Sequence, residues 1–369
     1  MDDSQPRPNE PALETEATST SWTIEAEILE PSVRASQGSA QVERVPRQVR
    51  WVLAWLPAVS FPVFVVVASL VVSMIVMFIG LLSYASPEQM ADQEQLLEVM
   101  NGWMRTPSGF FWSAATAQIV MLLCASAVAL FSRETWRERL GLRRGAYPVW
   151  TWGVLALSAP GIALMVDSVF QLVAQAFAFE PSAHLIELER TIASQSESHL
   201  SLVILAIAIL PGIAEEFVFR GYMQDRLTKL WHPGVAIAVS SVAFAFAHID
   251  PMHVALVMPL GFWLGVIAYR ANTVWPCILG HFANNLFSIV LTIPAVGAMV
   301  EGSTEWIMLG VFGCLAFGSL GILFWYPRRQ KVTPQWAQEL VAPKIVQAVA
   351  VPPTASQKDE GIVWVEPRS

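Results

Sequence analysis

The chain has 369 residues, of which 54% are hydrophobic and only 14% are charged. A soluble protein of this length carries more surface charge, so the composition excludes an ordinary soluble globular domain. The net charge of -8 comes mainly from residues 1–43, which hold nine acidic residues and two arginines. The remainder is close to neutral and has no basic patch, which argues against nucleic acid as a partner.

The N-terminal residues 1–50 are rich in Glu, Ser, Thr, Pro and Gln and show no sustained apolar periodicity, so we expect a disordered acidic cytoplasmic tail. The first apolar run starts after residue 50 and no cleavable signal peptide precedes it, so the first span is expected to act as an uncleaved signal. Residues 51–326 are the predicted transmembrane domain. Residues 327–369, rich in Pro, Val and Gln, are predicted to form a mobile cytoplasmic tail.

Long apolar runs predict an all-α fold, a polytopic bundle of transmembrane helices in contact with the lipid bilayer. Hydropathy predicts about eight spans, at residues 58–83, 110–131, 148–178, 200–221, 235–249, 252–269, 274–298 and 305–326. The segments between them alternate between many and few Lys and Arg residues. The positive-inside rule then places both termini in the cytoplasm.

Two carboxylates and a guanidinium follow an apolar run in the fourth predicted span, as Glu215, Glu216 and Arg220. Ionisable groups at membrane depth are costly and are usually partnered and functional. On a helix Glu216 and Arg220 are i,i+4 neighbours that can pair, while Glu215 points about 100° away from Glu216. Because Arg226 and Lys229 follow, we expect this cluster at the cytoplasmic end of the span, within reach of a substrate in the inner leaflet.

Three further polar positions interrupt the later and earlier apolar runs. His248 ends a run in which Phe244 shares its helical face, and His281 and Asn285 form another i,i+4 pair. Asp167 stands alone in the third predicted span, where it is expected to line a polar cavity or bond a neighbouring helix.

These residue types suit amide hydrolysis, which needs a base for the attacking water, hydrogen-bond donors for the oxyanion and a proton for the leaving amine. Each signal also has a structural interpretation, because intramembrane His, Asn and Glu–Arg pairs often serve as contacts between helices. A metal site is a further alternative. Glu215, His248 and His281 could bind zinc if their helices converge, although the single-helix His-Glu-x-x-His motif is absent.

The order and spacing of these residues resemble the CPBP family, the CAAX proteases and bacteriocin-processing proteins that are also called the Abi family. The resemblance covers roughly residues 110–300 and rests on three motifs. They are Glu-Glu-x-x-x-Arg at Glu215, Glu216 and Arg220, Phe-x-x-x-His at Phe244 and His248, and His-x-x-x-Asn at His281 and Asn285.

The resemblance implies an intramembrane endopeptidase in which Glu215 activates water with help from His248. It implies that His281 and Asn285 hold the oxyanion. Glu216 and Arg220 would organise the site. Catalysis in this family is described both as metal-dependent and as glutamate-dependent without a metal, so zinc is a possible cofactor and none is assigned.

Resemblance to the family does not fix the substrate. The substrate is expected to be a membrane-anchored protein or peptide, with prenylated CAAX proteins as one class, and the location a bacterial plasma membrane. The alternative from another functional class is a non-catalytic bacteriocin-immunity or scaffold protein that retains the polar core.

Overall fold

The computed structural model describes residues 47–132, 134–178, 180, 182–293, 296 and 303–326. These residues form helices and connecting segments, with no strand among them. The predicted tails at 1–46 and 327–369 lie outside the described residues. Helix α1 begins at Arg47, slightly before the predicted start of the membrane domain at residue 51.

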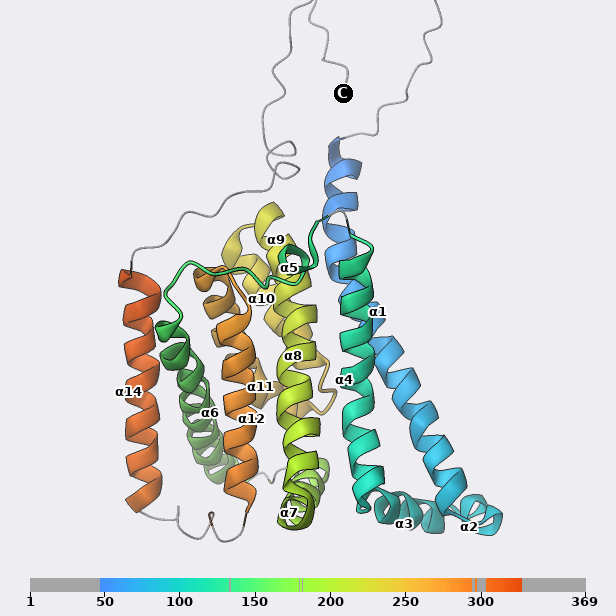
Figure 1. Cartoon of the computed structure of the whole chain (residues 1–369). Coiled ribbons are helices and arrows are strands. Elements are labelled where there is room, and N and C mark those ends of the chain that lie inside the picture. The colour runs from blue at the N-terminus through green and yellow to red at the C-terminus, as the bar shows by residue number, and fades with distance from the viewer. Residues whose placement is uncertain are drawn as a thin grey trace, which may run out of the picture. The chain divides into compact units, whose positions relative to one another are not determined.

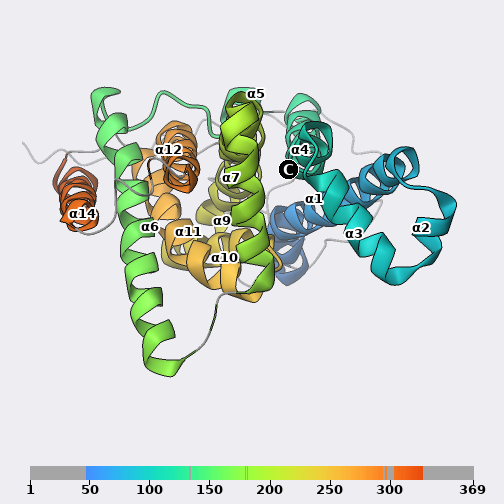
Figure 2. The ribbon, with the colours of Figure 1, turned by 90° about the horizontal axis from the view of Figure 1, so that it is seen from below.

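The helices are arranged as a bundle in which segments distant in sequence lie side by side (Figures 1 and 2). Helix α6 packs against α11, α12 and α14, and α1 packs against α4. The bounds are α1 Arg47–Tyr84, α2 Pro87–Ala91, α3 Gln93–Met104, α4 Pro107–Leu130, α5 Trp136–Arg139, α6 Trp150–Phe177, α7 Ala183–Val203, α8 Leu210–Glu215, α9 Asp225–Leu230, α10 Pro233–Phe246, α11 Pro251–Ala271, α12 Trp275–Thr292 and α14 Ser303–Trp325.

Six helical stretches are long and apolar enough to cross a membrane, which confirms a multi-pass integral membrane protein. They are Ala54–Tyr84, Pro107–Leu130, Trp150–Phe177, Ser198–Leu230, Pro251–Ala271 and Trp306–Trp325. The other two predicted spans overlap α10, which is shorter, and α12, which carries His281 and Asn285 in its middle. The count of eight crossings and the cytoplasmic position of both termini stay predictions.

The fourth stretch is one continuous helical path from α7 to α9 with two wider π-helical turns, η1 at Ile204–Ile209 and η2 at Glu216–Gln224. Such turns are rare and occur frequently at functional sites. The path continues to Leu230, so Glu215 lies near the middle of the stretch. The helix therefore continues beyond the predicted end of the span at residue 221, and Arg226 and Lys229 belong to it rather than to a loop. The position of Glu215 toward the cytoplasmic side stays a prediction.

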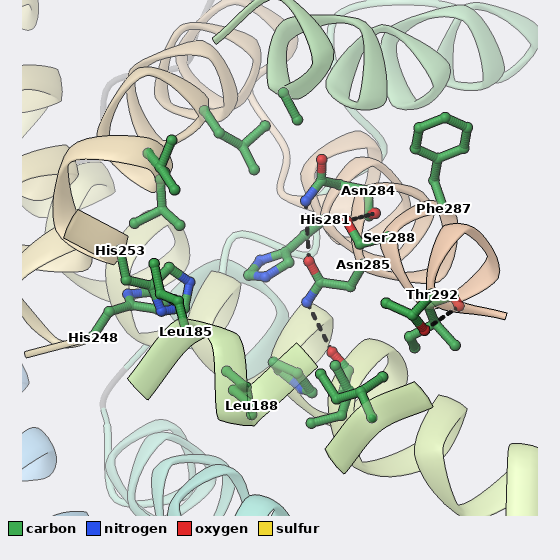
Figure 3. A pocket seen from close by; sticks show the side chains of 18 of the residues that line it. Leu185, Leu188, His248, His253, His281, Asn284, Asn285, Phe287, Ser288 and Thr292 are labelled. Carbon is green, nitrogen blue, oxygen red and sulfur yellow. Dashed lines mark hydrogen bonds between the residues drawn. The ribbon is translucent and has the colours of Figure 1, made fainter. Parts of the chain in front are cut away.

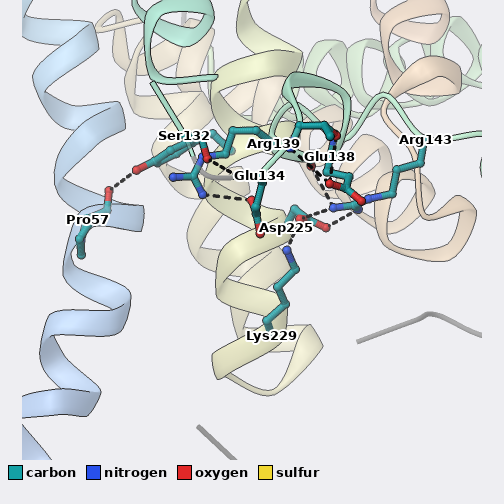
Figure 4. A network of polar contacts seen from close by, with 10 residues as sticks. Pro57, Ser132, Glu134, Glu138, Arg139, Arg143, Asp225 and Lys229 are labelled. Atoms are coloured by element: carbon teal, nitrogen blue, oxygen red, sulfur yellow. Dashed lines mark hydrogen bonds and ion pairs between the residues drawn. The ribbon is translucent and has the colours of Figure 1, made fainter. Parts of the chain in front are cut away.

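The described residues 131–132 and 134–149, which we call the strap, contact the ends of three helices; Figure 4 shows the polar contacts around Asp225. Arg143 donates to both carboxylate oxygens of Asp225 at 2.7 and 2.8 Å, and Lys229 pairs with the same carboxylate at 2.8 Å. The Arg143 carbonyl accepts from the hydroxyl of Thr273 at 2.8 Å. The Ala146 amide donates to the Ala271 carbonyl. The strap thus fixes α9, α11 and α12 relative to one another.

The tightest contact of the strap with the helix that carries the glutamates is at Gly221. A Cβ atom added there would lie 2.4 Å from the carbonyl oxygen of Leu140, which is backbone and cannot swing aside. A glycine is needed at this position for space.

Gly221→Ala should therefore lower the free energy of unfolding by about 1–3 kcal/mol, as overpacking against a fixed backbone usually does. Thermal unfolding in detergent measures the effect. Gly153→Ala is the matched control, because a Cβ atom at Gly153 meets nothing within 4 Å and alanine favours the helix. Equal stability of the two variants would contradict the close contact.

Candidate active site

A cavity of about 580 Å³ lies among α4, α6, α7, α8, α10, α11 and α12 (Figure 3). Its walls are mostly apolar, with a small group of polar side chains at particular points, as is usual for substrate pockets. The polar residues that line it are Gln118, Asp167, Glu215, His248, His253, His281, Asn284, Asn285, Ser288 and Thr292.

Glu216 lies beside the cavity in a fully buried ion pair. Its Oε1 accepts from Nη1 of Arg220 at 2.9 Å and from Nδ1 of His281 at 3.0 Å, and neither side chain of the Glu–Arg pair is exposed. The i,i+4 pairing predicted from the sequence is confirmed. A buried pair of this kind needs good geometry and further hydrogen bonds to offset the loss of hydration.

Arg220 obtains those further contacts from two other helices. Its Nη2 donates to the carbonyl of Gly261 in α11 at 3.1 Å, and its guanidinium lies 4.2 Å from the ring centroid of Phe244 in α10. The Phe244 ring also stands edge-on to His281, at 5.8 Å between centroids. Arg220 therefore connects the three motifs, because it contacts Glu216 and Phe244, and both of these contact His281.

Glu215 has quite different surroundings from its neighbour. Its Oε1 accepts from Nε2 of Gln118 in α4 at 2.8 Å, and its Oε2 has no hydrogen-bond partner among the described residues. Oε2 lies 3.9 Å from Nε2 of His281, too far for a direct hydrogen bond. Glu215 thus lines the cavity with one carboxylate oxygen that is buried and has no hydrogen-bond partner among the described residues.

The orientation of His281 is set by Glu216. A carboxylate accepts hydrogen bonds only, so Nδ1 of His281 carries the hydrogen in this contact. Nε2, on the other side of the ring, faces Glu215. The histidine therefore lies between the two glutamates and bonds directly to the one that is paired with arginine.

His248 follows the end of α10 and lines the cavity next to a second histidine (Figure 3). Its Nδ1 lies 3.1 Å from the Phe244 carbonyl, which can only accept, so Nδ1 donates and Nε2 is left as an acceptor. The ring of His253 in α11 stands 4.6 Å away, centroid to centroid. The backbone of His253 is fixed by Asp250, which caps the start of α11.

Asn285 lies on the cavity wall with its amide partly engaged. Nδ2 donates to the carbonyl of Ile207 in η1 at 2.8 Å, and Oδ1 accepts from Asn284 at 3.1 Å (Figure 3). The amide nitrogen has two hydrogens, so one bond to Ile207 leaves a second donor. The structure thus brings Glu215, His248, His281 and Asn285 to one cavity, as the motifs predict.

Three polar residues that line the cavity were not predicted from the sequence. Gln118 is an isolated polar residue in the second apolar run, His253 lies at the start of the sixth predicted span, and Asn284 is next to a motif residue. Gln118 could have been found from the sequence, because it is a polar side chain inside an apolar run. Asp167 lines the cavity as expected, and it accepts from Gln171 on its own helix at 2.7 Å.

The residues present do not fit a zinc site. No group of three or more His, Cys, Asp or Glu side chains in the described part of the chain is placed to hold a metal ion. Glu215, His248 and His281 line the cavity without converging as three ligands. These three residues are therefore not assigned as zinc ligands in the mechanism below.

Comparisons with known proteins bear on the same region. Residues 197–287 match the family described as "Type II CAAX prenyl endopeptidase Rce1-like". Over 112 residues the chain is 27% identical to a Bacillus subtilis (strain 168) protein named "Putative membrane peptidase YdiL". That match covers 30% of this chain and 46% of the relative, so the chain spans about half the length of the curated protein it matches. No solved structure matches the chain.

The matched residues include Glu215, Glu216 and Arg220, the Phe244–His248 motif and the His281–Asn285 motif, all of which meet around Arg220 and the cavity. Sequence match and motif geometry therefore agree, and residues 197–287 are similar to the Rce1-like family of CAAX prenyl endopeptidases.

Proposed function

We propose that the protein is an intramembrane endopeptidase that hydrolyses a peptide bond in a membrane-anchored protein or peptide. The observation that carries the proposal is the different environment of two adjacent glutamates. Each carboxylate has one oxygen without a hydrogen-bond partner, but Glu216 is paired with Arg220, whereas Glu215 bonds the neutral amide of Gln118 and lines the cavity. A general base must lie near the substrate and be able to take a proton, and Glu215 meets both conditions.

In this mechanism Glu215 takes a proton from a water molecule whose oxygen attacks the carbonyl carbon of the scissile bond. The proton then passes from Glu215 to the leaving amine as the tetrahedral intermediate collapses. The acceptor Nε2 of His248 suits it to holding the second hydrogen of the same water. Glu215 ends each cycle ionised, as it began.

The oxyanion would be stabilised from α12 by Asn285 and His281. The remaining amide hydrogen of Asn285 is one donor. His281 donates from Nε2 once that nitrogen is also protonated, and the Glu216 carboxylate at Nδ1 supplies the counter-ion for the resulting cation. Preorganised donors of this kind contribute most where water is excluded.

The substrate class follows from the membrane setting and from the family. The cavity walls are largely apolar, which favours a lipid-anchored or membrane-embedded segment. The description of the matching family names a CAAX prenyl substrate, and the relative from Bacillus subtilis supports a bacterial plasma membrane as the location.

Gln118 is part of the proposed mechanism as a positioning residue. It bonds Oε1 of Glu215 and so fixes the orientation of the carboxylate, while Oε2 is left without a hydrogen-bond partner. A neutral amide can donate to a carboxylate or, after turning over, accept from a carboxylic acid. Gln118 therefore suits a glutamate that gains and loses a proton, whereas Glu216 is held in an ion pair with Arg220.

Glu215→Gln should abolish cleavage while leaving expression and folding near normal, because the amide keeps the shape of the side chain but cannot take a proton. Mass spectrometry of peptides released from membranes that hold either form measures the loss. Glu98→Gln on α3, where the residue is exposed, is the matched control and should cleave like the native protein.

Cleavage by Glu215→Gln at the native rate would refute the assignment of the base. A scaffold or immunity protein would behave differently, because Glu215→Ala would still complement a deletion strain in full.

Gln118→Met should lower kcat about tenfold with little change in KM, because it removes the donor that orients the base without touching the substrate.

Gln171→Met is the control for that variant, since Gln171 also donates to a carboxylate, that of Asp167, without lining the cavity. Equal kcat for Gln118→Met and the native protein, or a loss of kcat that Gln171→Met shares, would contradict the positioning role of Gln118.

Arg220→Ala should reduce both stability and activity, because it leaves Glu216 buried without a counter-ion. Breaking a buried pair costs about 3–5 kcal/mol, measurable by thermal unfolding in detergent. Arg190→Ala is the comparison, since Arg190 is exposed and lies 3.9 Å from Glu187, where a pair contributes about 0–1 kcal/mol. Similar unfolding temperatures for the two variants would contradict the importance of the pair.

A further inference from the structure

The two ends of the bundle carry very different numbers of basic residues. At the end that contains the strap, the described basic residues are Arg47, Arg50, Arg137, Arg139, Arg143, Arg144, Arg226, Lys229 and Arg270. At the opposite end, which contains α2, α3 and α7, the described ones are Arg105 and Arg190. Lys and Arg gather on the cytoplasmic side of membrane proteins, so the strap end faces the cytoplasm and the α7 end faces outward.

The helices that line the cavity place it in the outward half of the bundle. Helix α11 starts at the outward end, and its cavity residues run from His253 to Leu260. Helix α12 ends there, and its cavity residues run from His281 to Thr292. No lining residue in the described part of the chain comes from the strap or from α9. Glu215 therefore lies at the inner end of a cavity that extends away from the cytoplasm.

Helix α7 lines the outward part of this cavity. Leu185, Leu188 and Ile192 are its lining residues, at a spacing that puts them on one helical face. Figure 2 shows α7 lengthwise at this end of the bundle, and Figure 3 shows Leu185 and Leu188 beside the histidines of the cavity. Glu189 and Arg190 are exposed, as expected for a helix that lies at the membrane surface.

We infer that the cavity is reached from the extracytoplasmic side of the membrane. The substrate is then a membrane-anchored protein or peptide whose scissile bond lies at or beyond the outer half of the bilayer. A prenylated C-terminus anchored in the cytoplasmic leaflet would lie on the wrong side of Glu215. The substrate class rests on the proposed function, whereas the side from which the cavity opens does not.

The experiment tests from which side of the membrane a water-soluble reagent reaches the cavity. Cys124, Cys277 and Cys314 are replaced by alanine, and single cysteines are then introduced in the full chain. Ser194→Cys reports on exposed α7, Trp136→Cys on the exposed strap, and Ser288→Cys on the cavity wall. Each variant, expressed in a bacterial plasma membrane, is treated in spheroplasts with a membrane-impermeant charged methanethiosulfonate. The thermal unfolding of each variant checks that it is folded.

The inference predicts that Ser194→Cys and Ser288→Cys are labelled in sealed spheroplasts, and that Trp136→Cys is labelled only after permeabilisation. Labelling of Ser288→Cys only after permeabilisation would overturn it. Labelling of Trp136→Cys in sealed spheroplasts, with Ser194→Cys labelled only after permeabilisation, would also overturn it. Because labelling needs no proteolysis, a negative result here is distinct from loss of the proposed activity. A protein that labels as expected but cleaves nothing would refute the endopeptidase proposal alone.

Discussion

The buried contact between Glu216 and Arg220 is the interaction on which the rest of the site depends. Four helices meet through it, because Arg220 reaches the Gly261 carbonyl in α11 and the Phe244 ring in α10 while Glu216 holds His281 in α12. Removing either charge leaves the other unpaired in an apolar interior. The three motifs are thus parts of one packing unit, and their roles cannot be separated by position in the sequence alone.

That unit also explains how neighbouring carboxylates can have different chemistry. The cation and the imidazole are both bonded to Glu216, so the neutral amide of Gln118 is the direct partner of Glu215. A glutamate that bonds a neutral donor can change its proton state without disrupting an ion pair. The structural role of Glu216 and the catalytic role proposed for Glu215 therefore arise from the different partners of the two carboxylates.

The sequence predicted the helical bundle, the Glu216–Arg220 pair and the meeting of the motif residues, because hydropathy and helical spacing are local properties. It did not reveal Gln118 as the partner of Glu215, since that contact joins residues far apart in the chain. It also placed Glu215 too near the end of its helix. Arg226 and Lys229 lie beyond the predicted end of the fourth span, but they belong to the helix, which continues to Leu230. In this region Asp225 pairs with both Arg143 of the strap and Lys229.

The strap and α7 fasten the two ends of the bundle with unequal strength. The strap uses a bidentate ion pair and several backbone hydrogen bonds. Helix α7 is held by the pair between Arg105, which is largely exposed, and Glu187 at 2.8 Å, and by the hydrogen bond that the Gln195 side chain donates to the Arg105 carbonyl. An exposed pair contributes little and is screened by salt. Helix α7 also carries a non-helical residue at His199, where it joins the path to Glu215. Thermal motion of the bundle should therefore be greatest at its outer end, and ionic strength should change that motion without disturbing the inner one.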